Sequence, residues 1–181
     1  DLKKRIIKEL DETCPSHTII ASNTSGLSLT EMVSDIRRQD QAIIAHWYNP
    51  PHIIPVVEIV KGQYTSDQTV DLVYQLLLSI GKKPVKILKE VPGFLGNRLQ
   101  FALYREALYC LKEGIASAED IDMAVKGSYG FRLPTLGPLE TSDFGGLDTY
   151  LNIAEYLFKE IDRSTEPPEI LREKVRQGKL G

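Results

Sequence analysis

Several features are scarce in this 181-residue sequence, and each scarcity excludes a class of protein. The two cysteines, Cys14 and Cys110, are too few and too far apart for a disulfide framework. They do not resemble a metal site, so we expect reduced thiols and no bound metal. No apolar run approaches the ~20 residues that span a bilayer, and no signal peptide opens the sequence. We therefore expect a cytoplasmic protein with no membrane partner.

An excess of either charge is also lacking. The 22 basic and 25 acidic residues give a net charge of −3, and both signs are mixed along the chain. Because there is no basic stripe, we expect no nucleic-acid partner. The hydrophobic share of 42% is that of an ordinary globular protein. The length suffices for one good core or two small ones.

The hydrophobic pattern divides the chain into two parts. The first part alternates helix and strand signals, with helices expected at 2–12, from Ser28 onward and at 66–80, and strands at 18–21, 42–45, 56–60 and 84–88. After Pro92-Gly93 the pattern is helical only, at 97–112, after Ser117, and at 138–144, 147–161 and 169–176. The pattern predicts an α/β part with a parallel sheet over 1–91 and an all-α part over 92–181.

His46 and Glu58 are the first candidate pair for chemistry. His46 ends an apolar strand, and Glu58 lies within the apolar run Val56 to Val60. A carboxylate in such a run is costly to desolvate unless it is paired. A carboxylate partner would fix the tautomer of the imidazole and stabilise its charged form, as a general base requires. The spacing equally allows a core histidine and a solvent-facing glutamate.

Two further polar segments follow the ends of apolar elements. The loop from Ser22 to Gly26 could present hydroxyls and backbone amides to a ligand, or could simply be a turn. Asn97 comes just after Pro92-Gly93-Phe94, where it could bind a ligand or cap the next helix.

Taken together, these segments resemble the L-3-hydroxyacyl-CoA dehydrogenase family, in particular its 3-hydroxybutyryl-CoA dehydrogenases. The resemblance covers essentially the whole chain and rests on motifs in the family's order and spacing. In the first part these are Ser22-Asn23-Thr24-Ser25, His46-Trp47-Tyr48-Asn49-Pro50, Val57-Glu58-Ile59-Val60, Pro92-Gly93-Phe94 and Asn97-Arg98-Leu99. In the second they are Glu113-Gly114, Glu119-Asp120-Ile121-Asp122, Gly137-Pro138 and Gly146-Leu147-Asp148.

The resemblance implies a fold, a cofactor and a set of roles. The fold would be the back half of a Rossmann-type parallel sheet followed by a helical C-terminal domain. The cofactor would be NAD. His46 would act as the base and Glu58 would orient it. Ser25 would lie near the nicotinamide and the reacting oxygen, and Asn97 would hold the substrate oxygen. Asn23 and Lys3 would also contact the cofactor.

One family feature is missing. The Gly-x-Gly-x-x-Gly fingerprint that receives the pyrophosphate occurs nowhere in the sequence. We therefore expect a piece truncated at both ends, which lacks the NAD-binding front half and by itself binds NAD weakly or not at all.

The implied activity is the interconversion of L-3-hydroxyacyl-CoA and 3-ketoacyl-CoA in fatty acid metabolism, with short acyl chains. A related dehydrogenase of CoA-free 3-hydroxy acids, of the carnitine or gulonate type, is an alternative. So is an inactive dimerisation module. The resemblance also implies a homodimer through the helical domain, with apolar residues Phe101, Leu103, Tyr104, Ala107, Leu108 and Leu111 at the surface, although these residues could instead fill that domain's core.

Overall fold

The protein is described by a computed structural model that covers residues 2–180. Its chain separates into two compact units, Asp1–Gln100 (unit 1) and Phe101–Gly181 (unit 2). Each unit is described by itself.

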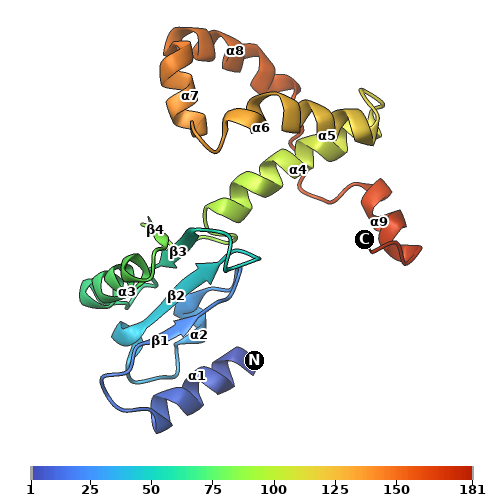
Figure 1. Cartoon of the computed structure of the whole chain (residues 1–181). Helices are drawn as coiled ribbons and strands as arrows, with labels where there is room; N and C mark the ends of the chain where they lie inside the picture. Colours follow the sequence, from blue (N-terminus) through green and yellow to red (C-terminus); the bar gives the residue numbers. More distant parts are fainter. Residues whose placement is uncertain (1, 181) are drawn as a thin grey trace. The chain divides into compact units, whose positions relative to one another are not determined.

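Unit 1 is a four-stranded sheet with helices on both faces (Figure 1). The strands lie side by side in the order β1-β2-β3-β4. In chain order the elements are α1 (Leu2–Thr13), β1 (Ile20–Ser22), α2 (Leu29–Met32), a single 3-10 turn (Gln39–Gln41), β2 (Ala42–Trp47), β3 (Val56–Val60), α3 (Asp67–Ser79), β4 (Lys83–Ile87) and the start of α4 (Gly96–Lys112).

The sheet is mixed. β1 pairs with β2 and β3 pairs with β4 in parallel, as predicted. The prediction of a parallel sheet is wrong for β2 and β3, which are antiparallel. Only residues 48–55 connect these two strands, whereas a parallel crossover needs about a dozen residues or more. The reversal places His46 directly opposite Glu58, so their side chains leave the same face of the sheet.

Two apolar clusters cover the two faces of the sheet. One contains Ile7 of α1, the α2 residues Leu29 and Met32, and Phe94. The other joins the opposite sides of β2 and β3 to Val70, Val73 and Leu77 of α3. The central strands β2 and β3 are therefore buried on both faces, which accounts for their nearly continuous apolar sequence.

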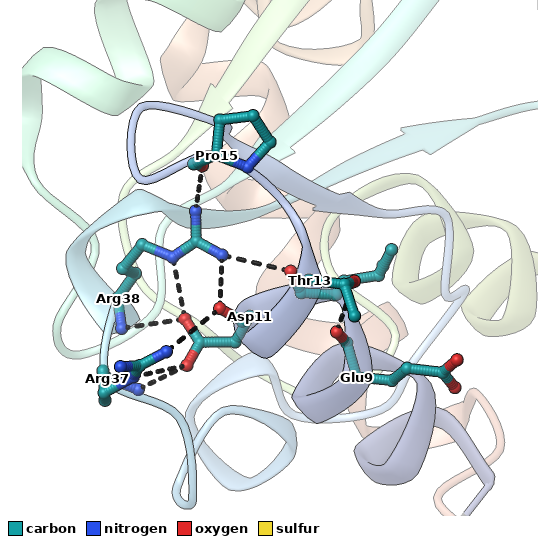
Figure 2. Close-up of polar contacts among 7 residues, drawn as sticks. Glu9, Asp11, Thr13, Pro15, Arg37 and Arg38 are labelled. Carbon is teal, nitrogen blue, oxygen red and sulfur yellow. Dashed lines mark hydrogen bonds and ion pairs between the residues drawn. The ribbon is translucent and has the colours of Figure 1, made fainter.

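A buried ion pair fastens α1 to the segment before β2 (Figure 2). Asp11 is only 4% exposed. Its carboxylate accepts hydrogen bonds from the Arg38 Nε at 2.8 Å and from the backbone N–H groups of Arg37 at 3.0 Å and Arg38 at 3.3 Å. The Arg38 guanidinium also donates to backbone carbonyls, including that of Pro15. The hydrogen bond from Arg38 is the main reason why the pKa of Asp11 falls from 3.8 to about 2.

Unit 2 is helical, as predicted. Besides the rest of α4 it contains α5 (Ala118–Gly127), α6 (Tyr129–Arg132), α7 (Pro138–Gly145), α8 (Leu147–Glu160) and α9 (Glu169–Arg176). None of the described residues of these elements is buried. The interpretation that the α4 residues fill a core of this domain is wrong for Phe101, which is 63% exposed, and for Leu103 and Tyr104, which are about 40% exposed. Ala107, Leu108 and Leu111 are half-buried.

Candidate active site

The candidate site is built around the paired side chains of His46 and Glu58. His46 Nδ1 lies 2.8 Å from Glu58 Oε2, and the two residues are 4% and 2% exposed. The sequence prediction of this contact is confirmed by the geometry. Because β3 is an inner strand of the sheet, the interpretation of Glu58 as a solvent-facing edge residue is wrong.

Glu58 is held on its other side by the start of α4. Its Oε1 accepts hydrogen bonds from the backbone N–H groups of Leu95 at 3.1 Å and Gly96 at 2.7 Å. Such N–H groups at a helix start have no partner within the helix and favour a negative charge. The carboxylate is thereby compensated although it is buried.

A strained turn orients these two backbone N–H groups toward Glu58. Phe94 has a φ of 50°, a left-handed conformation that bulky side chains rarely adopt, and Gly93 before it has a φ of 75°. Phe94 is only 1% exposed, and its burial in the core holds the turn in this shape. The Pro92-Gly93-Phe94 segment therefore acts by directing backbone donors at Glu58.

This arrangement fixes the protonation pattern of the imidazole. A carboxylate that already accepts two amide hydrogen bonds can only accept from His46, so Nδ1 carries the proton. The other ring nitrogen, Nε2, is left with its lone pair free to accept a proton. The geometry is that of a general base oriented by a carboxylate.

Two aromatic rings enclose the imidazole. The ring centroid of Tyr48 is 4.9 Å away at an interplanar angle of 55°. That of Phe94 is 5.5 Å away with its edge toward the imidazole. These rings exclude water from two sides of His46, which strengthens the interaction with Glu58.

The other candidate residues lie on the loop after β1 and at the start of α4. Asn97 Nδ2 donates to the backbone carbonyl of Ser25 at 3.0 Å, and Asn23 Oδ1 accepts from the backbone N–H of Trp47 at 2.9 Å. The exposed Ser25 hydroxyl makes no hydrogen bond to any part of the chain that is described. Asn23, Ser25 and Asn97 are thus tied to the segments that carry His46 and Glu58.

Lys3 is placed differently. It lies in the first turn of α1 with an exposed side chain. Within residues 2–180, no hydrogen bond or ion pair links it to the other candidates. The structure therefore brings five of the six candidate residues into one connected set.

A hollow of about 260 Å³ adjoins this set. It is lined by residues that follow Ser25 and by the segment before α4, namely Gly26, Leu27, Ser28, Glu31, Glu90, Val91, Pro92 and Phe94. Phe94, which contacts the His46 ring, forms part of its wall. A wider hollow of about 580 Å³ shares Ser28, Glu31 and Glu90 with it and extends to Lys61 and Leu88.

Comparison with known protein families matches both parts of the chain. Residues 1–91 match the NAD-binding domain of 3-hydroxyacyl-CoA dehydrogenase, and residues 93–181 match its C-terminal domain. The chain belongs to the 3-hydroxyacyl-CoA dehydrogenase family. NAD is the cofactor of the domain that residues 1–91 match, so the expectation of this cofactor is confirmed.

Several relatives are similar along almost the whole chain. The 3-hydroxybutyryl-CoA dehydrogenase of Clostridioides difficile is 41% identical over 100% of this chain and 63% of the relative. A crystal structure of (S)-3-hydroxybutyryl-CoA dehydrogenase from Ralstonia eutropha has a TM-score of 0.77 and 40% identity over 100% of this chain and 63% of that one. The crystal structure of 5-formyl-3-hydroxy-2-methylpyridine 4-carboxylic acid 5-dehydrogenase, an NAD+-dependent dismutase, has a TM-score of 0.97 and 34% identity over 99% and 58%.

The chain spans about 60% of the length of these relatives, 58% and 63% in the cases above. The prediction that the NAD-binding half is missing is not supported, because the NAD-binding domain matches residues 1–91. The absence of the glycine fingerprint from those residues remains a fact of the sequence.

The described residues fit one end of NAD better than the other. The smaller hollow has no basic residue in its lining and contains Glu31 and Glu90, which suits a cationic nicotinamide and not a pyrophosphate. Ser25 directly precedes Gly26 of this lining, so its free hydroxyl would be available to the nicotinamide end beside the hollow.

Sequence reasoning missed several members of the site. The backbone donors of Leu95 and Gly96 carry no side-chain signal, although a glycine directly before Asn97 could have indicated a close approach of the backbone. Tyr48 and Phe94 were noted only as parts of motifs. Outside the site, the buried Asp11 was also missed, because a buried aspartate in an amphipathic helix cannot be told from a solvated one in the sequence.

Proposed function

We propose that the protein that contains this chain is an oxidoreductase that interconverts L-3-hydroxyacyl-CoA and 3-ketoacyl-CoA with NAD. Short acyl chains are proposed as substrates, with 3-hydroxybutyryl-CoA as the example. The observation that carries the proposal is the buried 2.8 Å contact between His46 and Glu58, with Nε2 left free as a base.

The chain's own residues would act on one proton. His46 Nε2 accepts the proton of the substrate 3-hydroxyl, and the electrons of that O–H bond form the carbonyl as the carbon loses its hydride. NAD, when bound, supplies the acceptor for that hydride. Glu58 stabilises the imidazolium that results. Asn97 uses one amide N–H on Ser25, so its second N–H is available to the substrate oxygen.

The test is the reduction of acetoacetyl-CoA by NADH in the intact protein. His46→Gln should lower kcat by about 10²–10⁴-fold, the usual contribution of a general base. His52→Gln is the matched control, because His52 is exposed and outside the site. Turnover of His46→Gln close to that of the unaltered protein would remove the base from the proposal.

A CoA-free substrate is the second candidate. It is favoured by the TM-score of 0.97 to the pyridine-carboxylate dehydrogenase, against 0.77 for the 3-hydroxybutyryl-CoA dehydrogenase. Asn49-Pro50-Pro51 and the segment Gly137 to Thr141 also lean toward dehydrogenases of free hydroxy acids, while Gly146-Leu147-Asp148-Thr149 leans toward the CoA branch. Comparison of kcat/KM for acetoacetyl-CoA with that for a free 3-keto acid separates the two candidates.

We further propose that the 181-residue chain alone has little affinity for NAD. The reason is chemical: the chain contains no glycine fingerprint, and the hollow beside its site has no basic residue in its lining to hold the pyrophosphate. Isothermal titration of the chain with NAD should show no micromolar binding. A dissociation constant in the micromolar range would contradict this proposal.

Homodimer formation through unit 2 is proposed from its exposed apolar side chains. Phe131, Leu139 and Phe144 are each at least 80% exposed, and no described residue of α5 to α9 is buried. Burial of such side chains in a second copy would give the helices a shared core. Light scattering should give twice 20.4 kDa, which is about 41 kDa. A mass near 20 kDa would contradict the dimer and leave these side chains unexplained.

The remaining alternative is that the protein is not an enzyme and that its helical unit only joins two copies. Absence of turnover in the intact protein with every substrate above would favour it.

A cytoplasmic location also stays a prediction. Among residues 2–180, no helix has both the length and the apolar character needed to cross a bilayer.

A further inference from the structure

Tyr48 is a polar aromatic residue at the site for which the proposed chemistry has no use so far. It follows His46 by two positions, directly after the end of β2, and its ring lies beside the imidazole. The two rings are 4.9 Å apart between centroids. The residue is only half-buried, yet its hydroxyl points inward, to the start of α4.

The position of that hydroxyl is fixed by Gly96. A Cβ atom built on Gly96 would lie 1.8 Å from Tyr48 Oη and 2.7 Å from its Cζ. No side chain can therefore replace the glycine hydrogen without displacing the phenol. The backbone N–H of the same glycine donates to Glu58 Oε1 at 2.7 Å. Tyr48 and Glu58 thus meet at the first residue of α4.

Tyr48 can only serve as a donor at this place. Burial, followed by the proximity of the Glu58 carboxylate, raises the pKa of Tyr48 above its usual value of 10. The phenol therefore keeps its proton at any physiological pH. Because a carboxylate can only accept, a hydrogen bond between these two side chains has to be donated by the Tyr48 hydroxyl.

We propose that Tyr48 is a positioning residue whose hydroxyl, seated against Gly96, holds the Glu58 carboxylate in the orientation that orients His46. This inference rests on the proposed function of His46 as a base. Without the hydroxyl, the carboxylate keeps two amide donors on Oε1 but loses the restraint against rotation about its last bond. The Oε2 atom would then meet His46 Nδ1 less often at 2.8 Å.

The first test observes the hydrogen bond itself and needs no activity. In proton NMR spectra, the Nδ1 proton of a histidine bonded to a carboxylate resonates far downfield, and the signal of His46 is identified by its loss in His46→Gln. Tyr48→Phe should shift or broaden this signal. Tyr74→Phe is the matched control, because Tyr74 lies on α3 in the other apolar cluster, beside Lys86. An unchanged signal in Tyr48→Phe would overturn the inference.

Gly96→Ala provides a second variant, since it pushes the hydroxyl away without removing it. It should affect the downfield signal in the same direction as Tyr48→Phe. Unfolding monitored by the fluorescence of Trp47, the only tryptophan, checks that both variants are folded. A Gly96→Ala signal identical to that of the unaltered chain would also count against the inference.

The kinetic test separates this inference from the proposed function. In the intact protein, Tyr48→Phe should lower kcat about tenfold and leave KM within about twofold, the effect of one hydrogen bond to a charged group. Loss of turnover in His46→Gln combined with normal kcat in Tyr48→Phe would refute only the role of Tyr48. Normal turnover in His46→Gln would refute the proposed function, whereas the NMR result would still decide whether Tyr48 holds Glu58.

Discussion

Asp11 joins α1 to the Arg37-Arg38 segment, and its replacement by asparagine measures how much that junction stabilises unit 1. The carboxylate accepts three hydrogen bonds, from the two backbone N–H groups and from Arg38 Nε. Asparagine has one acceptor oxygen, and its NH₂ group would face donors. Arg38, whose side chain is 13% exposed, would lose its charge partner.

The magnitude follows from the pKa of Asp11. Its fall from 3.8 to about 2 corresponds to at most about 2.5 kcal/mol, at about 1.4 kcal/mol for each pH unit. The Arg37 side chain beside it is 78% exposed, so screening by solvent reduces this to about 1–2 kcal/mol. Asp11→Asn should therefore lower the free energy of unfolding at pH 7 by about that amount.

The sign of the pH dependence is also determined. Because the pKa of Asp11 is lower in the folded state, the stabilisation is complete above about pH 5 and is lost as the pH falls toward 2. The difference between the unaltered chain and Asp11→Asn should shrink over that interval. Asp71→Asn, which removes an exposed ion pair with Lys86, is the control and should lower the free energy of unfolding by less than Asp11→Asn does.

The assay is urea unfolding followed by the fluorescence of Trp47, which lies in unit 1 and is the only tryptophan. It is run at pH 7 and at pH 3. The reasoning would be refuted if Asp11→Asn lowered the free energy of unfolding no more than Asp71→Asn does. It would also be refuted if the decrease in Asp11→Asn were equal at both pH values.

Two further predictions concern the segments around the site. Asn97→Ala removes the hydrogen bond to the Ser25 carbonyl. It should lower kcat/KM at least about tenfold, because the Ser25 loop is released and a donor to the substrate is lost. Asn152→Ala in α8 is the control, and equal kcat/KM values for the two variants would contradict the role of Asn97. Glu90→Ala removes the acceptor of the Leu29 and Thr30 backbone N–H groups and should lower the free energy of unfolding by about 1–2 kcal/mol. An unchanged urea midpoint would contradict this, because it would show that water replaces the carboxylate as acceptor.

Much of unit 1 could be predicted because its residues carry strong local signals. The apolar runs around Ile43 and Val57 identified buried strands. Ser28, Ser66 and Ser117 each accept a hydrogen bond from the backbone N–H three residues later, as their positions before helices predicted. The direction of β3 could not be read from its residues, because a buried strand has the same composition in either direction.

The site was predictable to the extent that its chemistry lies in side chains. His46 and Glu58 were identified because a carboxylate inside an apolar strand requires a partner. The donors on Leu95 and Gly96 are backbone groups, and they depend on the left-handed turn at Phe94. Such groups become visible only when the chain is folded. The contact between the Tyr48 hydroxyl and Gly96 depends on the same turn.

Replacement of Glu58 by glutamine tests the central claim most directly. Glutamine keeps the size of the side chain but cannot both accept from His46 and retain the charge that stabilises an imidazolium. In the intact protein, Glu58→Gln should lower kcat on the order of 10²–10⁴-fold, whereas Glu12→Gln, at an exposed position of α1, should leave it unchanged. Equal kcat values for Glu58→Gln and Glu12→Gln would contradict the assignment of His46 and Glu58 as the catalytic pair.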